Sequence, residues 1–460
     1  MDAIFERKCY EKLVEWKGRS NGRTALLVEG ARRVGKTTLV EAFVSAEYDA
    51  HLVIDFSKTT DEVRNVFRHH ADDIGTLLRM LQLLHGVELP ERRSAIVFDE
   101  VQRFPPAREM VKHLIADRRF DYLETGSLIS IKKNTEGIVI PSEEDRVALR
   151  PLDFEEYLWA CGKRLLAEEI RRSFEAKTAL PDALHRQAMR LFDEYLVVGG
   201  MPQAVTAFVE DETFSECERE KRRILALYED DIAKFGGADS RRALAVFKGI
   251  PGQLSANSKR FNFSTLKRGL RYEDYESALN WLEDSHIVNV CRLCTDPNVG
   301  FRLTADESRL KCYMGDTGLL VSHAFADADE NLEIQRALQF GRVSVNRGML
   351  VENYVAQQLR AGGYNLFYYS WEEPAKDARS SKPRPREIDF LLTRGFSDAA
   401  GKLRVSPVEA KSTKTYSTVS LDDFARRFPK RTGDEFVLHA KQLRIEGKRL
   451  YLPLYMAHLL

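Results

Sequence analysis

The chain has 460 residues, which is too long for one ordinary domain, and its composition of 43% hydrophobic and 30% charged residues excludes a disordered protein. Lys plus Arg and Asp plus Glu both number 70, so the net charge is zero. This balance excludes a histone-like coat on nucleic acid but permits a local basic patch. Six scattered cysteines make no disulfide framework, and we find neither an apolar run of membrane-spanning length nor a signal peptide. We therefore expect a cytoplasmic protein without a membrane partner.

The first motif lies between an apolar strand and a helix. The sequence VEGARRVGKTTL, residues 28–39, contains the phosphate-binding pattern G-x-x-x-x-G-K-[ST]. A glycine loop between a strand and a helix points backbone N–H groups and the helix N-terminus at phosphates. We expect Lys36 to reach the β- and γ-phosphates of ATP, and Thr37 to bind Mg²⁺ through its hydroxyl. The predicted nucleotide contacts are Gly30, Ala31, Arg32, Arg33, Val34, Gly35, Lys36, Thr37 and Thr38.

A second strand, SAIVFDEVQ, ends in two carboxylates. Asp99 is predicted to hold Mg²⁺, and Glu100 to polarise the water that attacks the γ-phosphate. Because a GTPase-type site would not need the adjacent glutamate, the pair favours ATP hydrolysis. An Asp-Glu pair after a strand is a weak signal alone, but it is strong downstream of a phosphate-binding loop.

Further polar candidates follow this strand. The third strand, FDYLETGS, ends in Thr125-Gly126-Ser127. A polar side chain at this tip, Ser127 in particular, is predicted either to contact the γ-phosphate or the attacking water, or to cap a turn or helix. Arg146 and Arg150 come next and are candidates for stabilising transition-state charge, in cis or in trans. A role in trans would require a homo-oligomer, which the sequence leaves open.

The middle of the chain has two patterns. Helical spacing extends from Pro151 to about Lys234, broken at Gly199-Gly200. From Ser240 to about Leu320, three helical runs precede two short strands, which is a winged-helix order. Basic residues near the second helix suit phosphate contact: Lys259, Arg260, Lys267, Arg268 and Arg271. The third helix is acidic, however, which favours a protein-contact or structural role over DNA reading.

Near the C-terminus, carboxylates lie on a helix and on two strands. Glu352 is on an amphipathic helix, Asp389 lies midway in a strand, and the next strand carries Glu409 and Lys411. Residues two apart in a strand share a face, so we expect these groups to meet. The carboxylates would bind Mg²⁺, and Lys411 would activate water or stabilise charge. A basic loop precedes Asp389: Lys376, Arg379, Lys382, Arg384 and Arg386. The alternative is a salt-bridged core network or a non-cleaving docking domain.

The segments GARRVGKTTL, IVFDEVQ, ETGS, DRVALRPLDFEEYL and YLVVGGMPQAV together resemble the AAA+-type ATPases of bacteria and archaea that carry a C-terminal domain of unknown function. The resemblance covers nearly the whole chain. It implies an ATPase core, a helical lid, a winged-helix segment and a nuclease-like tail. It also favours Arg146 as the arginine that acts on the nucleotide, although this chain has Asp145 where the family usually has glycine.

The C-terminal set resembles the restriction-endonuclease-like PD-(D/E)xK nucleases, Holliday junction resolvases in particular. Four residues match that pattern: Glu352, Asp389, Glu409 and Lys411. The motif is loose, because Glu-x-Lys is common by chance, and the order of the residues and their strand context carry the resemblance. It implies a metal-dependent nuclease fold.

The predicted fold is α/β: a P-loop NTPase (AAA+-like) core with a helical lid, a winged-helix segment and a restriction-endonuclease-like α/β C-terminal domain. The expected boundaries are 1–160, 161–235, 236–325 and 326–460. We expect Mg²⁺-dependent ATP hydrolysis that drives a conformational switch, with nucleic acid, DNA favoured, as the client. The alternative is a regulatory ATPase whose tail docks a protein or nucleic acid and cuts nothing.

Overall fold

The structure is a computed structural model. It describes residues 5–126, 143–211, 213–234, 237–256, 258–325, 347–374, 383–394 and 403–460. The chain divides into two compact units. The first comprises Met1–Arg150 with Asp284–His286, and the second comprises Pro151–Glu283 with Ile287–Leu460. No helix in the described ranges is both long enough and apolar enough to cross a bilayer.

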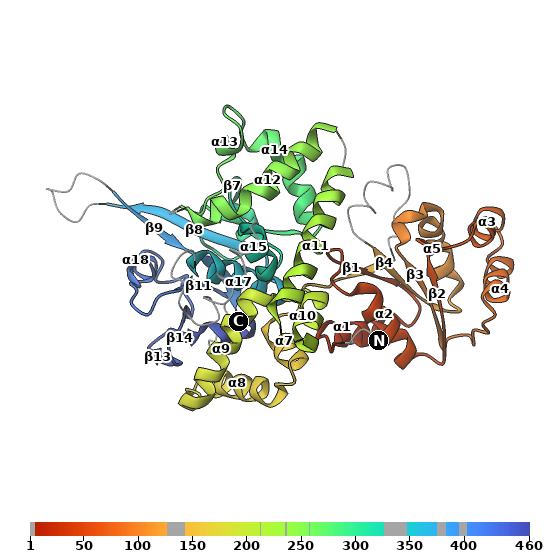
Figure 1. Cartoon of the computed structure of the whole chain (residues 1–460), viewed down its shortest axis with the longest axis horizontal. Coiled ribbons are helices and arrows are strands. Elements are labelled where there is room, and N and C mark those ends of the chain that lie inside the picture. Colours follow the sequence, from red (N-terminus) through yellow and green to blue (C-terminus); the bar gives the residue numbers. More distant parts are fainter. Residues whose placement is uncertain are drawn as a thin grey trace. The chain divides into compact units, whose positions relative to one another are not determined.

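The first unit is built around a five-stranded parallel sheet in the order β2-β3-β4-β1-β5 (Figure 1). Its strands are β1 (Ala25–Glu29), β2 (Ala50–Asp55), β3 (Ser94–Asp99), β4 (Asp121–Gly126) and β5 (Glu144–Ala148). Its helices are α1 (Cys9–Ser20), α2 (Lys36–Glu47), α3 (Asp61–His69), α4 (Ile74–His85), the 3-10 helix η1 (Val101–Arg103) and α5 (Pro105–Asp117). Because the strands are parallel, the residues that follow β1, β3 and β4 meet at one edge of the sheet.

Both faces of this sheet are covered, which explains the near-continuous apolar strands. β3 and β4 are buried at every position. Alternate residues of β1 enter different cores: Ala25 and Leu27 pack with residues of α3, α4 and α5, while Leu26 and Val28 pack with residues of α1 and α2. The strand edge that carries the phosphate loop is therefore held between two packed layers.

The second unit begins with helices, and the helical run predicted from Pro151 to about Lys234 is confirmed. Asp153 and Glu156 form a capping box at the start of the first helix. The helices are α7 (Phe154–Ala160), α8 (Arg164–Ala176), α9 (Asp182–Val198), α10 (Pro202–Asp211), α11 (Phe214–Lys234), α12 (Gly237–Ser255), α13 (Phe263–Leu266) and α14 (Tyr272–Asp284).

Two sheets complete the second unit. The order of one is β7-β6-β8-β9, and the order of the other is β10-β11-β12-β14-β13. The strands are β6 (Val288–Cys294), β7 (Ala305–Met314), β8 (Leu366–Glu373), β9 (Arg384–Ile388), β10 (Phe390–Arg394), β11 (Arg404–Ala410), β12 (Glu435–His439), β13 (Arg444–Glu446) and β14 (Arg449–Pro453). The remaining helices are η2 (Phe301–Thr304), α15 (Thr317–Ala324), α17 (Arg347–Ala361), α18 (Val419–Arg427) and η3 (Leu454–Leu459).

The expected domain boundaries remain predictions. The boundary between the two compact units falls between residues 150 and 151. In the second unit, β6 and β7 form one sheet with β8 and β9. This sheet includes strands from both sides of the expected division at 325/326, because β6 pairs in parallel with β8. The α/β class is confirmed: a parallel sheet with flanking helices is followed by additional helices and sheets.

Gly199 and Gly200 do more than end α9. A Cβ on Gly199 would lie 2.2 Å from Asp316 Oδ1, and a Cβ on Gly200 would lie 2.1 Å from the carbonyl oxygen of Leu152. The backbone N–H of Gly200 donates to Asp316 Oδ2 (2.6 Å), and Leu152 N–H donates to the Gly200 carbonyl (2.7 Å). The pair of glycines therefore lets three segments of the second unit meet at backbone distance.

The Gly200→Ala variant should lower the free energy of unfolding by about 1–3 kcal/mol, because the new methyl group overlaps a backbone oxygen that cannot rotate away. Gly252→Ala is the matched control: it lies in α12, and a Cβ there has nothing within 4 Å. That control should be neutral or stabilising. Urea unfolding of both variants measures the difference. Equal stabilities would contradict the close approach at Gly200.

Candidate functional site

The loop after β1 has the geometry of a phosphate cradle. Arg33 and Gly35 have positive φ angles of 69° and 93°. A Cβ on Gly30 would lie 2.3 Å from the Leu149 carbonyl oxygen, so only glycine fits there. α2 begins at Lys36. Its N-cap is Gly35, which has no side chain that could bond to the first amides of the helix. Those N–H groups point toward the site where a phosphate would bind.

Lys36 and Thr37 lie as the motif predicts, beside the end of β3. The Lys36 ammonium is buried and donates to the carbonyl oxygens of Gly30 and Ala31, both at 3.0 Å. The Thr37 hydroxyl donates to Asp99 Oδ1 at 2.9 Å. Burial lowers the pKa of Lys36, and the carboxylates of Glu100 and Asp99 oppose that shift. The structure therefore brings the predicted ammonium, hydroxyl and carboxylates together at one sheet edge.

Glu100 is held by two residues that the motif analysis did not select. Glu100 has a left-handed backbone (φ 52°), and its N–H donates to Thr125 Oγ1 at 3.3 Å. The Thr125 hydroxyl also donates to Asp99 Oδ1. Gln102 Nε2 donates to Glu100 Oε2 at 2.6 Å. Thr125 could have been found as a polar residue at the tip of β4; the only signal for Gln102 is its position two residues after Glu100.

These residues fit a magnesium nucleotide. The Thr37 hydroxyl and Asp99 carboxylate supply hard oxygen ligands at hydrogen-bonding distance from each other, and Mg²⁺ prefers such oxygens. The loop supplies backbone donors and the Lys36 ammonium for phosphate oxygens. The predicted contact at Ser127 lies outside the described residues.

Arg146 lies midway along β5, the edge strand of the sheet, and not at the strand ends that carry the phosphate loop. It occupies β5 opposite Leu27, and its Nε donates to Glu144 Oε1 at 2.7 Å. Its side chain is 42% exposed. Arg108 pairs with Glu144 and with Glu124, both at 2.6 Å. Within the described residues, no hydrogen bond or ion pair joins Arg146 to the Thr37–Asp99 group.

Burial of the Arg108 cluster has a consequence for protonation. Arg108, Glu124 and Glu144 side chains are each at most 1% exposed. Burial raises the pKa of Glu124 to about 7, although the Arg108 guanidinium opposes the shift. Glu124 immediately precedes Thr125, so this charge network supports the tip of β4.

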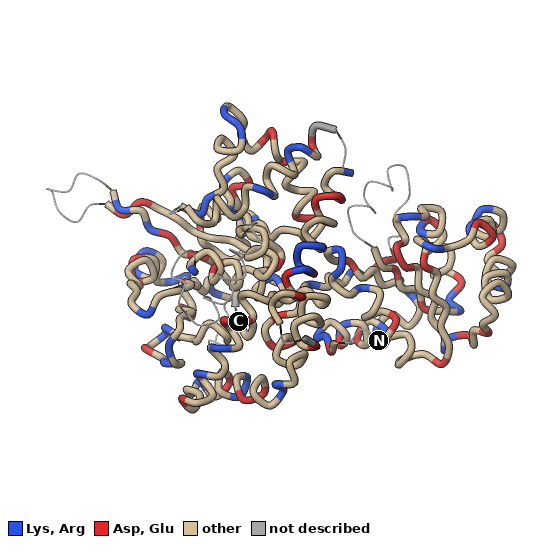
Figure 2. The backbone as a smooth tube through the Cα atoms, viewed as in Figure 1, with Lys and Arg blue, Asp and Glu red and all other residues tan. Residues whose placement is uncertain are grey.

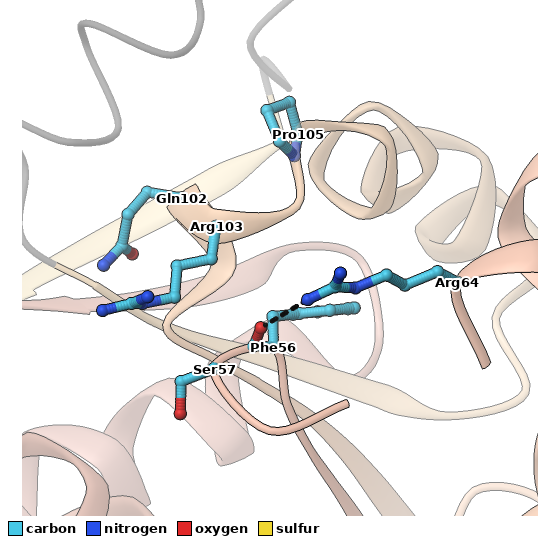
Figure 3. A pocket seen from close by; sticks show the side chains of 6 residues that line it. All are labelled: Phe56, Ser57, Arg64, Gln102, Arg103 and Pro105. Carbon is cyan, nitrogen blue, oxygen red and sulfur yellow. Dashed lines mark hydrogen bonds between the residues drawn. The ribbon is translucent and has the colours of Figure 1, made fainter. Parts of the chain in front are cut away.

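A surface pocket of about 450 Å³ adjoins Glu100 (Figure 3). Six residues line it: Phe56, Ser57, Arg64, Gln102, Arg103 and Pro105. The Arg64 guanidinium lies beside the Phe56 ring, and the Arg103 side chain points away from Arg64. Arg64 Nη2 donates to the Phe56 carbonyl oxygen at 3.3 Å. Gln102 lines the pocket and also donates a hydrogen bond to Glu100, so one residue of the pocket wall directly contacts the candidate base.

The C-terminal carboxylates surround a lysine that sequence reasoning missed. Lys311 in β7 is fully buried, and its Nζ lies 2.9 Å from Glu352 Oε1 and 2.7 Å from Glu387 Oε1. It lies 3.9 Å from Asp389 Oδ1. Glu352 also pairs with Lys259 and accepts a hydrogen bond from Tyr313. These cations hold the pKa of Glu352 below its usual range against the opposing effect of burial.

The sequence analysis predicted that Asp389 lies midway in one strand, and this prediction is wrong. Asp389 lies between β9 and β10, where the chain leaves one sheet and enters the other, because β9 pairs with β8 while β10 pairs with β11. Its Oδ2 accepts the N–H of Ala410 at 2.9 Å. Burial raises the pKa of Asp389, and the Glu352 carboxylate adds to the increase.

Glu409 and Lys411 form their own pair. Lys411 Nζ lies 2.7 Å from Glu409 Oε2. Burial raises the pKa of Glu409 to about 7 against the effect of Lys411. In the described part of the chain, no group of three or more His, Cys, Asp and Glu side chains has the arrangement to hold a metal ion.

The predicted basic surface divides into buried and exposed residues. Lys259 and Arg260 face inward, toward Glu352 and Ser370 respectively. Lys267, Arg268 and Arg271 are exposed near α13, where Figure 2 shows Lys and Arg at the end of the helix. Arg384 is exposed, whereas Arg386 pairs with Asp423 at 2.7 Å. The other members of the basic loop, Lys376, Arg379 and Lys382, lie outside the described residues.

Three family models match separate parts of the chain. Residues 22–158 match an AAA domain. Residues 189–330 and 347–456 match two domains of unknown function, DUF8612 and DUF4143 respectively. No curated protein matches the chain.

Several solved structures share a weak overall likeness with the chain. The ORC1 protein of Aeropyrum pernix, solved in complex with DNA, is 12% identical with a TM-score of 0.27, over 71% of this chain and 94% of that one. Cdc6p of Pyrobaculum aerophilum is 11% identical with a TM-score of 0.25, over 74% and 98%. A Pyrococcus horikoshii signal transduction ATPase with numerous domains (STAND) is 11% identical with a TM-score of 0.26, over 78% and 49%. TM-scores this low carry no argument about function. The family match and the geometry of the loop after β1 together show that residues 22–158 form a P-loop ATPase domain of the AAA type.

Proposed function

We propose that this chain hydrolyses ATP with Mg²⁺ and uses the cycle as a conformational switch that acts on nucleic acid, with DNA favoured as the client. One observation carries the proposal: the Thr37 hydroxyl lies 2.9 Å from Asp99 Oδ1, directly after the loop lysine. The six cysteines are few and scattered along the chain, which supports a place in the cytoplasm.

Each residue of the edge has a distinct task in this proposal. Lys36 leaves the Gly30 and Ala31 carbonyls to neutralise phosphate oxygens. Thr37 and Asp99 hold Mg²⁺, which neutralises charge on the phosphates when bound. Glu100 accepts a hydrogen bond from the attacking water and orients it. Gln102 and Thr125 fix Glu100, because one donates to its carboxylate and the other accepts from its backbone.

Nucleic acid is the proposed client because four of the predicted basic residues in the second unit are exposed. Lys267, Arg268, Arg271 and Arg384 are all exposed, and lysine and arginine at a surface bind phosphate backbones without regard to sequence. Arg386 is excluded from this set, since its guanidinium is already paired with Asp423.

A second candidate is a regulatory ATPase whose tail docks a partner without cutting nucleic acid. The observation in its favour is the ion-pair network at Glu352, which places Lys311 and Lys259 where the nuclease resemblance expects a metal. Both candidates share the same ATPase chemistry and differ only in what the tail does.

One experiment tests the proposal and separates its two forms. The full chain is incubated with ATP and Mg²⁺, with and without plasmid, branched and single-stranded DNA and a single-stranded RNA. ATP turnover that a nucleic acid stimulates supports the nucleic-acid switch. Turnover that none of them alters supports the docking form with a protein client. No turnover under any condition overturns the ATPase proposal.

The Arg146→Ala variant should turn over ATP about ten- to a hundredfold more slowly with little change in ATP affinity, because negative charge on the γ-phosphate grows only in the transition state. Arg172→Ala is the control, since that exposed arginine pairs only with neighbours one helical turn away among its described contacts. Because Arg146 lies midway along β5 and not at the strand ends that carry the loop, we propose that it acts in trans in a homo-oligomer. Mixing Arg146→Ala with Lys36→Ala protein should then restore turnover. Unchanged turnover in Arg146→Ala alone would remove Arg146 from the mechanism.

A further inference from the structure

The carboxylate cluster of the second unit already contains a cation. Lys311 Nζ lies within 2.9 Å of Glu352 and 2.7 Å of Glu387, and 3.9 Å from Asp389. The face of the Tyr368 ring lies 5.1 Å from the same nitrogen. The Lys311 side chain is 0% exposed, so these groups, rather than water, solvate its charge. A buried ammonium is stable only when carboxylates and hydrogen bonds compensate its lost hydration.

Several of the oxygens that a metal would need are already engaged. Glu352 Oε1 accepts from Lys311 and Tyr313, and its Oε2 pairs with Lys259. Asp389 Oδ2 accepts the backbone N–H of Ala410 at 2.9 Å. A divalent ion requires several such oxygens at about 2.0–2.6 Å from one point, and it would repel an ammonium at that point.

The third carboxylate of the predicted metal site has a separate partner. Glu409 Oε2 lies 2.7 Å from Lys411 Nζ. The cluster therefore provides three lysines, Lys259, Lys311 and Lys411, for the carboxylates that were predicted to hold Mg²⁺. These three lysines face four carboxylates, because Lys311 also pairs with Glu387, so lysine already balances most of the negative charge at this site.

We propose that the Lys311 ammonium is the resident cation of this cluster and takes the place of the divalent metal that the nuclease resemblance requires. The tail accordingly binds no divalent ion at Asp389 and does not cleave phosphodiester bonds. Instead, Lys311 and Lys259 tie β7 and the segment between α12 and α13 to α17, so that the carboxylates serve as an internal clamp of the second unit.

The probe for the test is Mn²⁺ alone, counted by electron paramagnetic resonance on the nucleotide-free full chain. Four proteins are compared: wild type, Asp389→Asn, Lys311→Met, and Lys311→Met with Asp389→Asn. Binding at the Thr37–Asp99 edge is common to all four and cancels in the differences. Glu372→Gln is the matched control, because Glu372 is exposed on the neighbouring strand β8.

We expect wild type and Asp389→Asn to bind the same amount of Mn²⁺. We expect Lys311→Met to gain one Mn²⁺ that the double variant lacks, and its Tm to rise with Mn²⁺ while that of wild type does not. Removing Lys311 exposes several buried carboxylates to one another, so the variant can fail to fold. In that case, the difference in bound Mn²⁺ between wild type and Asp389→Asn tests the proposal without the Lys311 variants.

Two results would overturn the proposal. One is a Mn²⁺ ion in wild type that Asp389→Asn removes. The other is cleavage of any DNA or RNA by wild type, with Mg²⁺ or Mn²⁺, that Asp389→Asn abolishes. Neither result affects the ATPase proposal, because ATP turnover is measured separately and depends on residues of the first unit.

Discussion

The Lys36→Ala protein is expected to bind ATP about a hundredfold more weakly than wild type and to show no measurable hydrolysis. The Lys36 ammonium is buried in the loop, where its carbonyl partners at 3.0 Å place it beside the site for the phosphates. Hydrogen bonds to charged groups contribute about 1.5–3 kcal/mol each, and 1.4 kcal/mol is tenfold in affinity. Alanine removes this buried charge from the loop.

Isothermal titration calorimetry with ATP and Mg²⁺ measures the loss of affinity, and phosphate release measures the loss of turnover. Lys112→Ala is the control, because Lys112 is an exposed lysine of α5. The control should bind and hydrolyse ATP as wild type does. Normal turnover in Lys36→Ala would show that the loop at Gly30 does not hold the phosphates.

The Glu100→Gln protein is expected to bind ATP normally and to hydrolyse it about 100- to 10,000-fold more slowly, which is the usual contribution of a positioned base. Glutamine keeps the shape of the side chain but removes the charge that polarises water. The hydrogen bond from Gln102 at 2.6 Å holds the residue at position 100 near the end of β3 in either form.

Single-turnover measurements separate this effect from binding. Asp99→Asn should behave differently. It removes the negative charge of the carboxylate that accepts from Thr37 and is proposed to hold Mg²⁺, so it should weaken Mg²⁺-dependent binding of ATP. Glu109→Gln, an exposed position of α5, serves as the control. A Glu100→Gln protein with the wild-type rate would assign the attacking water to another residue.

The nucleotide edge was predicted from the sequence because its parts are local. The loop from Gly30 to Thr37 is contiguous, and its function depends on backbone N–H groups that strand, turn and helix place without help from distant residues. Asp99 and Glu100 come at the end of a run of buried apolar residues, so the predicted strand already places them at the carboxyl edge of the sheet. The parallel sheet then joins the two segments at one edge, as expected.

The tertiary structure alone decided which neighbours surround these residues. Thr125 reaches Asp99 because β4 lies between β1 and β3, an order that no local pattern encodes. Arg146 had suitable chemistry in sequence, but its register opposite Leu27 places it midway along β5 and not at the strand ends that carry the loop. Strand order and register are set by packing over the whole sheet, so spacing in the sequence could not give them.

The tail shows the same limit more sharply. The sequence by itself determined that carboxylates lie on the helix α17 (Glu352) and on the strand β11 (Glu409), but it wrongly placed Asp389 inside a strand, whereas Asp389 lies between β9 and β10. The sequence could not reveal Lys311, which lies in a segment assigned to a different domain and enters the cluster through the pairing of β6 with β8. A motif fixes which charges are present, but the long-range contacts of the fold decide what counter-charge each one meets, because a buried carboxylate takes the nearest cation that packing supplies.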